Sequence, residues 1–195
     1  QSLLPAIMRV TYPMANKVIC VSYGVKEDLK DMLRLPDPKL TVIYNPVNVN
    51  CLTDLSAEPA VHPWLSSPST PILLAAGRLT YAKGFDVLID AMGVVNTDSD
   101  ARLIILGEGP EEKNLHRQID QMGLSECVSI PGFVNNPYPF FKHASLFVLS
   151  SRWEGLPTVL IEAIACGAQV VSTDCPSGPR EILGPNADHR LVPVD

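Results

Sequence analysis

The sequence has few aromatic residues, no long hydrophobic run and fewer basic than acidic side chains. Its longest apolar stretches, residues 72–76 and 144–149, are far shorter than the roughly 18 residues that indicate a membrane span. The 15 Lys and Arg against 21 Asp and Glu give a net charge of −6. Such a balance argues against a surface that binds nucleic-acid phosphates, so we expect no nucleic-acid partner.

The five cysteines stand singly, and none has the C-x-x-C spacing of a zinc site or a redox pair. Isolated cysteines in odd number are typical of reduced proteins, and we expect a cytoplasmic location. No secretory signal pattern is present. Because the chain opens with Gln1 and stops just after a strand-like run at 190–194, we expect it to be a fragment.

From Pro71 onward, short apolar runs alternate with stretches of helical periodicity. The predicted strands cover 71–76, 102–106, 128–130, 146–149 and 169–173, and the predicted helices cover 85–95, 111–122, 137–143 and 158–166. Continuous apolar strands separated by amphipathic helices imply a parallel sheet with helices on both faces. We therefore predict a Rossmann-like, doubly wound α/β domain over about residues 60–195.

The first 48 residues form a separate and shorter pattern. It consists of a helix and its exit over 1–17, strands at 18–22 and 40–44, a helix at 25–35 between them, and a turn at 45–48. Residues 49–70 are polar, contain proline and lack periodicity, which favours a linker. The predicted organisation is thus 1–48, linker 49–70 and the main domain 71–195.

Two basic residues follow the first strand of the main domain. Ligands of doubly wound sheets bind at the carboxyl ends of the strands, where this loop lies. Arg78 and Lys83 on such a loop, opposite a helix N-terminus, would neutralise a diphosphate without a metal. Two cations in a loop are equally compatible with simple solvation, so the residues alone leave both interpretations open.

Two glutamates flank the start of the predicted helix at 158–166. Pro157 suits the first helical position, and free N–H groups near Leu156 and Thr158 would form an anion site. Glu154 and Glu162 would lie about 10 Å apart, beyond the spacing of a glycosidase acid pair. The span suits an extended ligand with hydroxyl groups at each end and a diphosphate between them. A helix cap and a solvated face fit the same spacing.

Four motifs, in order, resemble the C-terminal, nucleotide-sugar half of family 4 glycosyltransferases of GT-B fold. They are Gly-Arg-Leu with Lys-Gly at 77–84, Leu-Gly-Glu-Gly-Pro at 106–110, the run at 151–167 that contains both glutamates, and Ser-Gly-Pro-Arg-Glu at 177–181. Residues 15–22 resemble the last strand of the N-terminal acceptor domain of that family, and residues 44–48 resemble its hinge. The resemblance therefore runs from about residue 15 to the end.

The resemblance implies a role for each matched residue. Arg78 and Lys83 would hold the donor diphosphate, and Glu154 would bind or orient the transferred sugar; these three are the expected catalytic residues. Glu162 would bind the ribose hydroxyls. The other implied donor-binding residues are Gly77, Gly155, Leu156 and Thr158 near the phosphates and Phe133 and Val134 near the base. Arg180 and Glu181 are further candidates for the border of the sugar pocket.

The activity that the resemblance implies is retaining, metal-independent sugar transfer. The donor would be a UDP-hexose or UDP-acetamidohexose, and the acceptor a lipid-linked or saccharide molecule in polysaccharide or lipopolysaccharide biosynthesis. No metal or cofactor is expected, since the nucleotide sugar is a co-substrate. The Asp98-Ser-Asp100 sequence is interpreted as a capping turn at the opposite end of the sheet.

Peripheral attachment to the inner membrane face, through an N-terminal domain that this chain lacks, is compatible with the resemblance. We expect the 195 residues alone to be inactive. The alternatives are a nucleotide-sugar epimerase of GT-B fold and a noncatalytic nucleotide-sugar-binding module. The presence together of Arg78, Lys83, Glu154 and Glu162 favours catalysis, because a scaffold does not need an acid at the sugar end.

Overall fold

The computed structural model describes residues 4–66 and 70–194. A six-stranded parallel sheet has the order β5-β4-β3-β6-β7-β8. Its strands are β3 (Ile72–Ala76), β4 (Arg102–Leu106), β5 (Val128–Gly132), β6 (Leu146–Leu149), β7 (Val170–Thr173) and β8 (Leu191–Val192). The chain grows outward from β3 to β5 and then returns to the other side of β3, so the topological switch point lies between β3 and β6.

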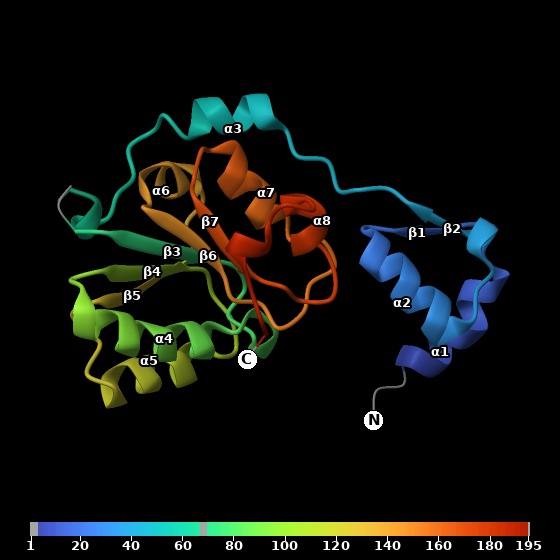
Figure 1. Cartoon of the computed structure of the whole chain (residues 1–195), viewed down its shortest axis with the longest axis horizontal. Coiled ribbons are helices and arrows are strands. Elements are labelled where there is room, and N and C mark those ends of the chain that lie inside the picture. The colour runs from blue at the N-terminus through green and yellow to red at the C-terminus, as the bar shows by residue number, and fades with distance from the viewer. Residues whose placement is uncertain (1–3, 67–69, 195) are drawn as a thin grey trace.

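Helices cover both faces of this sheet (Figure 1). One face carries α4 (Phe85–Asp98) and α5 (Glu112–Gln121), and the other carries α6 (Tyr138–His143) and α7 (Thr158–Ala165). In β4, Leu103 and Ile105 enter one hydrophobic cluster while Ile104 and Leu106 enter the other. This period of two with both faces buried is why the strand reads as an unbroken apolar run. The predicted doubly wound α/β fold is confirmed.

A small N-terminal unit stands beside this domain (Figure 1). It contains α1 (Leu4–Thr11), β1 (Val18–Cys20), α2 (Tyr23–Leu33) and β2 (Leu40–Val42), and β1 pairs with β2 in parallel. Its core is a separate cluster that includes Cys20, Leu29 and Leu40. Ser22 caps α2, because its side chain accepts a hydrogen bond from the amide of Val25.

The segment that we expected to be a linker contains a helix, α3 (Val49–Leu55). Asn48 caps it by accepting from the amide of Cys51 at 3.3 Å, and α3 contacts α6 and α7. Leu52 is the only buried residue of α3, and a single buried residue produces no helical periodicity in the sequence. The side-chain amide of Asn136 donates to the carbonyl of Leu55 at 3.0 Å. The segment is therefore attached to the main domain.

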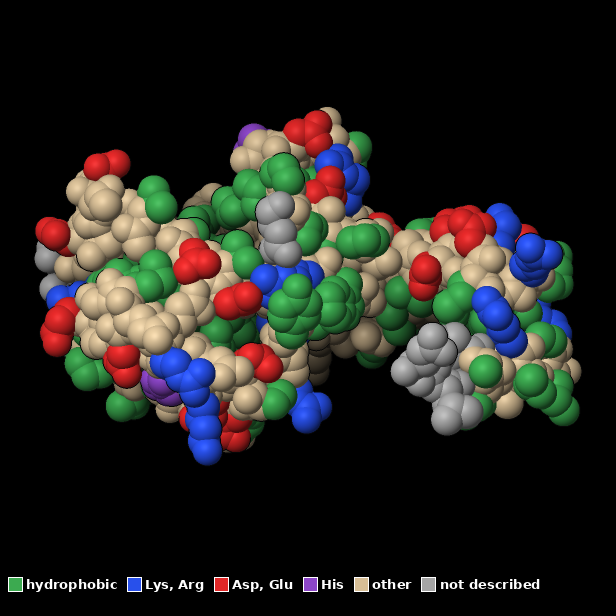
Figure 2. All heavy atoms as spheres, turned by 90° about the horizontal axis from the view of Figure 1, so that it is seen from below, with side chains coloured by type: hydrophobic (Ala, Val, Ile, Leu, Met, Phe, Trp, Pro, Cys, Tyr) green, Lys and Arg blue, Asp and Glu red, His purple; other side chains and the backbone are tan. Residues whose placement is uncertain are grey.

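The surface carries both signs of charge. On the face shown in Figure 2, acidic and basic side chains are interspersed. Within residues 4–66 and 70–194, no helix is both long enough and apolar enough to cross a bilayer.

Candidate functional site

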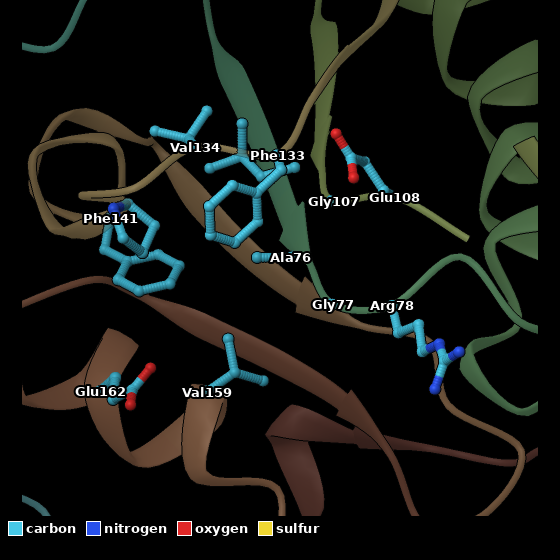
Figure 3. Close-up of a pocket in the computed structure, with 12 residues that line it drawn as sticks. Ala76, Gly77, Arg78, Gly107, Glu108, Phe133, Val134, Phe141, Val159 and Glu162 are labelled. Carbon is cyan, nitrogen blue, oxygen red and sulfur yellow. The ribbon is translucent and has the colours of Figure 1, made fainter.

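A cleft of about 450 Å³ opens at the carboxyl ends of β3, β4 and β5, beside α7 (Figure 3). Its walls are mostly apolar, and they come from the ends of β3 and β4, the loops after β3, β4 and β5, and two helices. The residues lining it are Ala76, Gly77, Arg78, Leu106, Gly107, Glu108, Phe133, Val134, Pro137, Phe141, Val159 and Glu162. The cleft therefore contains five of the ten residues that were predicted to be catalytic or donor-binding: Gly77, Arg78, Phe133, Val134 and Glu162.

The floor of the cleft is backbone, because a glycine directly follows β3 and another directly follows β4. A methyl group built on Gly107 would overlap the carbonyl oxygen of Gly77, and Gly107 has a φ of +139°. The amide of Gly77 bonds the carbonyl of Leu106 at 2.9 Å, and that of Gly107 bonds the carbonyl of Gly132 at 2.9 Å. Only glycine permits this close approach, which leaves room for a ligand above the strand ends.

Three charged side chains of the cleft, Arg78, Glu108 and Glu162, form what we call the open group. Within the described residues, none of the three has a side-chain hydrogen bond or ion pair. Arg78 is exposed, whereas Glu162 is half-buried, and burial raises the pKa of Glu162. Figure 3 shows Arg78 and Glu162 on opposite sides of the pocket, from the loop after β3 and from α7.

Three other side chains, Lys83, Ser151 and Glu154, form what we call the paired group. The Lys83 ammonium lies 2.5 Å from Oε1 of Glu154, and the Ser151 hydroxyl donates to the same oxygen at 2.6 Å. The Lys83 and Glu154 side chains are only 21% and 10% exposed. A methyl group on Gly77 would lie 3.4 Å from Cε of Lys83, so the paired group adjoins the cleft.

The loops that carry the paired group are fastened together. The Ser150 hydroxyl donates to the carbonyl of Lys83 at 2.8 Å, and Arg152 makes two bonds to the Asp86 carboxylate at 2.8 and 2.9 Å. The Arg152 guanidinium holds the pKa of Asp86 below its ordinary value. Gly84 has a φ of +61°, and a methyl group on it would overlap the Ser150 carbonyl oxygen. The loops after β3 and β6 thus behave as one structural unit.

Helix α7 begins at Thr158, where the predicted helix begins. Pro157 occupies the N-cap rather than the first helical position, and no side chain of the described residues caps the helix. Leu156 is buried, and Gly155 and Thr158 are half-buried. These three residues are absent from the cleft lining, to which the α7 region contributes Val159 and Glu162.

Seven lining residues were not predicted as site residues: Ala76, Leu106, Gly107, Glu108, Pro137, Phe141 and Val159. Glu108 follows β4, so the rule that selected Arg78 after β3 could have found it. Phe141 and Val159 lie on amphipathic helices, where an apolar residue that lines a pocket has the same sequence signal as one that fills the core.

Arg180 and Glu181 do not line this cleft, and their place at the border of the sugar pocket stays a prediction. Arg180 pairs with Asp174 and Asp188, and the Glu181 carboxylate binds the N-terminal unit. Their motif at 177–181 indicated a functional segment but not the direction of its side chains.

The D-x-D sequence at 98–100 lies between the end of α4 and the start of β4, at the amino end of the sheet and opposite the cleft. Among residues 4–66 and 70–194, no group of three or more His, Cys, Asp and Glu side chains is placed to hold a metal ion.

The sequence profile of glycosyl transferases group 1 matches residues 61–195, and that of glycosyltransferase family 4 matches residues 1–50. The chain belongs to the group 1 glycosyl transferases. The chain is 33% identical over 189 residues to the N-acetylgalactosamine-N,N'-diacetylbacillosaminyl-diphospho-undecaprenol 4-alpha-N-acetylgalactosaminyltransferase of Campylobacter jejuni, covering 97% of this chain and 50% of the relative.

A second relative, an uncharacterised glycosyltransferase of Methanocaldococcus jannaschii, is 35% identical over 176 residues, or 89% of this chain and 43% of the relative. The crystal structure of Anabaena HepE in complex with UDP matches 97% of this chain and 54% of its own, with a TM-score of 0.81 and 24% identity, which supports the GT-B fold. This glycosyl transferase chain spans about half the length of the curated relatives it matches.

Proposed function

We propose that this chain is the donor-binding half of a retaining, metal-independent glycosyltransferase that uses a UDP-hexose or UDP-acetamidohexose. The observation that carries the proposal is the cleft with Arg78 and Glu162 on opposite sides, both without partners among the described residues. A nucleoside diphosphate supplies a partner for each. Its ribose hydroxyls donate to a carboxylate, and its phosphates accept from a guanidinium.

The apolar walls of the cleft suit the base of the nucleotide. Phe133 is 69% exposed, an unusual state for a large aromatic side chain, and it lines the cleft beside Val134. A planar base that stacks on this ring would remove its surface from water. With the base there, the ribose would face Glu162, and the diphosphate would lie over the glycine floor towards Arg78.

The paired group would act at the sugar end. Both bonds of the Glu154 carboxylate go to Oε1, so in the described structure Oε2 is available to accept from a sugar hydroxyl. Lys83, next to Gly77, would stabilise the charge that develops on the departing diphosphate. Because both side chains are already fixed, little reorganisation would accompany the reaction.

The nature of the acceptor is inferred from the relatives. The name of the Campylobacter jejuni enzyme specifies a diphospho-undecaprenol substrate, and another relative, 27% identical, is a lipopolysaccharide 1,6-galactosyltransferase of Salmonella typhimurium. We therefore assign this protein to cell-surface glycan assembly at the cytoplasmic side of the membrane, with a lipid-linked or saccharide acceptor.

Calorimetric titration with UDP, GDP and ADP in EDTA tests the donor site. We expect UDP to bind without metal and Arg78→Ala and Glu162→Ala to weaken binding by about tenfold or more, since each removes a charge-assisted hydrogen bond. Arg117→Ala and Glu126→Ala, which remove exposed charges outside the cleft, serve as matched controls. Absence of binding by all three nucleotides, or equal binding by the variants, would contradict the proposal.

A further inference from the structure

The carboxylate of Glu181, on α8 (Pro179–Leu183), makes three hydrogen bonds to the N-terminal unit. It accepts from the amides of Tyr23 and Gly24 at 2.9 and 2.8 Å and from the hydroxyl of Tyr44 at 3.2 Å. Figure 1 shows α8 on the side of the main domain that faces α2. A single side chain of the main domain thus contacts both the first turn of α2 and the segment that leaves β2.

These bonds complete the start of α2. The first amides of a helix have no partner within the helix, and Ser22 satisfies only that of Val25. Glu181 supplies acceptors for the two amides before it and places a negative charge at the positive end of the helix dipole. The helix start is therefore capped partly by its own unit and partly by the other.

The start of α2 also packs against the loop that carries Glu154. A methyl group on Gly155 would lie 3.3 Å from a Val21 methyl and 3.8 Å from one of Val25. On its other side, α2 meets the loop that precedes α8, because a methyl group on Gly24 would lie 2.9 Å from the carbonyl oxygen of Pro176.

The loop before α8 also packs against the loop that leads into α7. Gly178 has a φ of +95°, and a methyl group there would overlap the ring of Pro157. Residues 21–25, 154–157 and 176–178 therefore form a three-segment junction, with no space for a methyl group at Gly24 or Gly178 and a tight fit at Gly155.

We propose that Glu181 is a positioning residue. It holds the start of α2 in the three-segment junction and thereby fixes the loop that presents Glu154 to the sugar of the donor. The inference rests on the proposed function for the role of Glu154. The three hydrogen bonds from Glu181 to Tyr23, Gly24 and Tyr44, which we call the clasp, rest on the contacts alone.

Hydrogen exchange of the 195-residue chain tests the clasp. In Glu181→Ala, the amides of Tyr23 and Gly24 should exchange at least about tenfold faster, and those of 155–156 should follow, because α2 no longer holds that loop. Glu181→Gln keeps one oxygen acceptor and should give intermediate rates. Amides of β3 and β4 that remain as slow as in the wild type show that the variant is folded; if Glu181→Ala fails this check, the Gln variant decides.

Asp188→Ala is the matched control, since it removes an acid whose recorded bond is to Arg180 and not to the N-terminal unit. Unchanged exchange at Tyr23 and Gly24 in a folded Glu181 variant would overturn the clasp. Faster exchange there without any change at 155–156 would overturn the positioning role.

Binding of UDP and of UDP-N-acetylglucosamine separates positioning from general loosening. Glu181→Ala should weaken the nucleotide sugar at least about threefold more than it weakens UDP, because only the sugar reaches Glu154; equal weakening would overturn the role. A wild-type chain that binds neither would contradict the proposed function, whereas the exchange rates would still decide the clasp.

Discussion

The open group and the paired group lie next to each other near the carboxyl ends of the strands, but their charged side chains differ in whether they have a partner. Lys83 and Glu154 neutralise each other at 2.5 Å and are mostly shielded from solvent. Arg78 and Glu162 have no partner among the described residues, and the pKa of Glu162 is raised by its partial burial. One part of the site is thus organised without a ligand, and under the proposed function the other part would gain its partners from the donor.

The largest effect should come from the loops that hold the paired group. Gly84→Ala is expected to lower the free energy of unfolding by roughly 3 kcal/mol or more, because its methyl group would overlap the Ser150 carbonyl at a positive φ. Gly123→Ala is the control: its φ is also positive, at +67°, but no atom lies within 4 Å, so strain alone should cost about 1 kcal/mol. Equal losses in urea denaturation would show that the loop contact is unimportant.

A smaller change in the free energy of unfolding should distinguish Lys83 from Arg78. Lys83→Met should lower the free energy of unfolding by about 2 kcal/mol, because it leaves the nearly buried Glu154 without its counter-ion. Arg78→Met should change it by less than about 0.5 kcal/mol, since Arg78 is exposed and has no partner in the described residues. Thermal denaturation of both variants measures the difference.

A double variant tests the cause of that difference. If the pair is responsible, Lys83→Met combined with Glu154→Gln should be more stable than the sum of the two single losses. Strict additivity would mean that the two side chains do not stabilise each other.

The smallest expected change in the free energy of unfolding is an increase. Burial raises the pKa of Glu162 in the folded chain, so this group contributes most stability below its unfolded pKa, and that contribution is lost as the pH rises through the folded value. Glu162→Gln lacks this loss and should be roughly 0.5 kcal/mol more stable than the wild type at pH 7, because solvent screens the half-exposed carboxylate.

Urea denaturation of the wild type and the Gln variant at about pH 4 and pH 7 checks this, and the difference should shrink at the lower pH. A variant that is less stable at pH 7 would show that Glu162 has a structural partner. A variant that is more stable but binds UDP more weakly would show that the open group trades stability for function.

The fold was predictable because its signals are local and repeated. The strands after Pro71 are continuous apolar runs, and the burial of both faces in β4 explains why no alternation was needed to recognise them. Helix α3 was not predictable, since its one clearly buried side chain, Leu52, depends on contacts with α6 and α7 that are distant in sequence.

The position of the site followed from topology, but its internal contacts did not. The rule that ligands lie after the strands selected Arg78, the spacing around a helix start selected Glu162, and the resemblance added Phe133. All three line the cleft. Whether two charged side chains form a pair depends on the tertiary structure. No spacing reveals that Lys83 and Ser151 both donate to one oxygen of Glu154, or that Glu181 turns away from the cleft.

The attachment of α3 has a further consequence for the two parts of the chain. Because α3 is packed on the main domain, the tether to the N-terminal unit consists only of residues 43–48, with the rigid Pro46 among them. A tether this short keeps the partners at an effective concentration on the order of millimolar or above. Contacts too weak to join separate molecules can therefore hold the two units together.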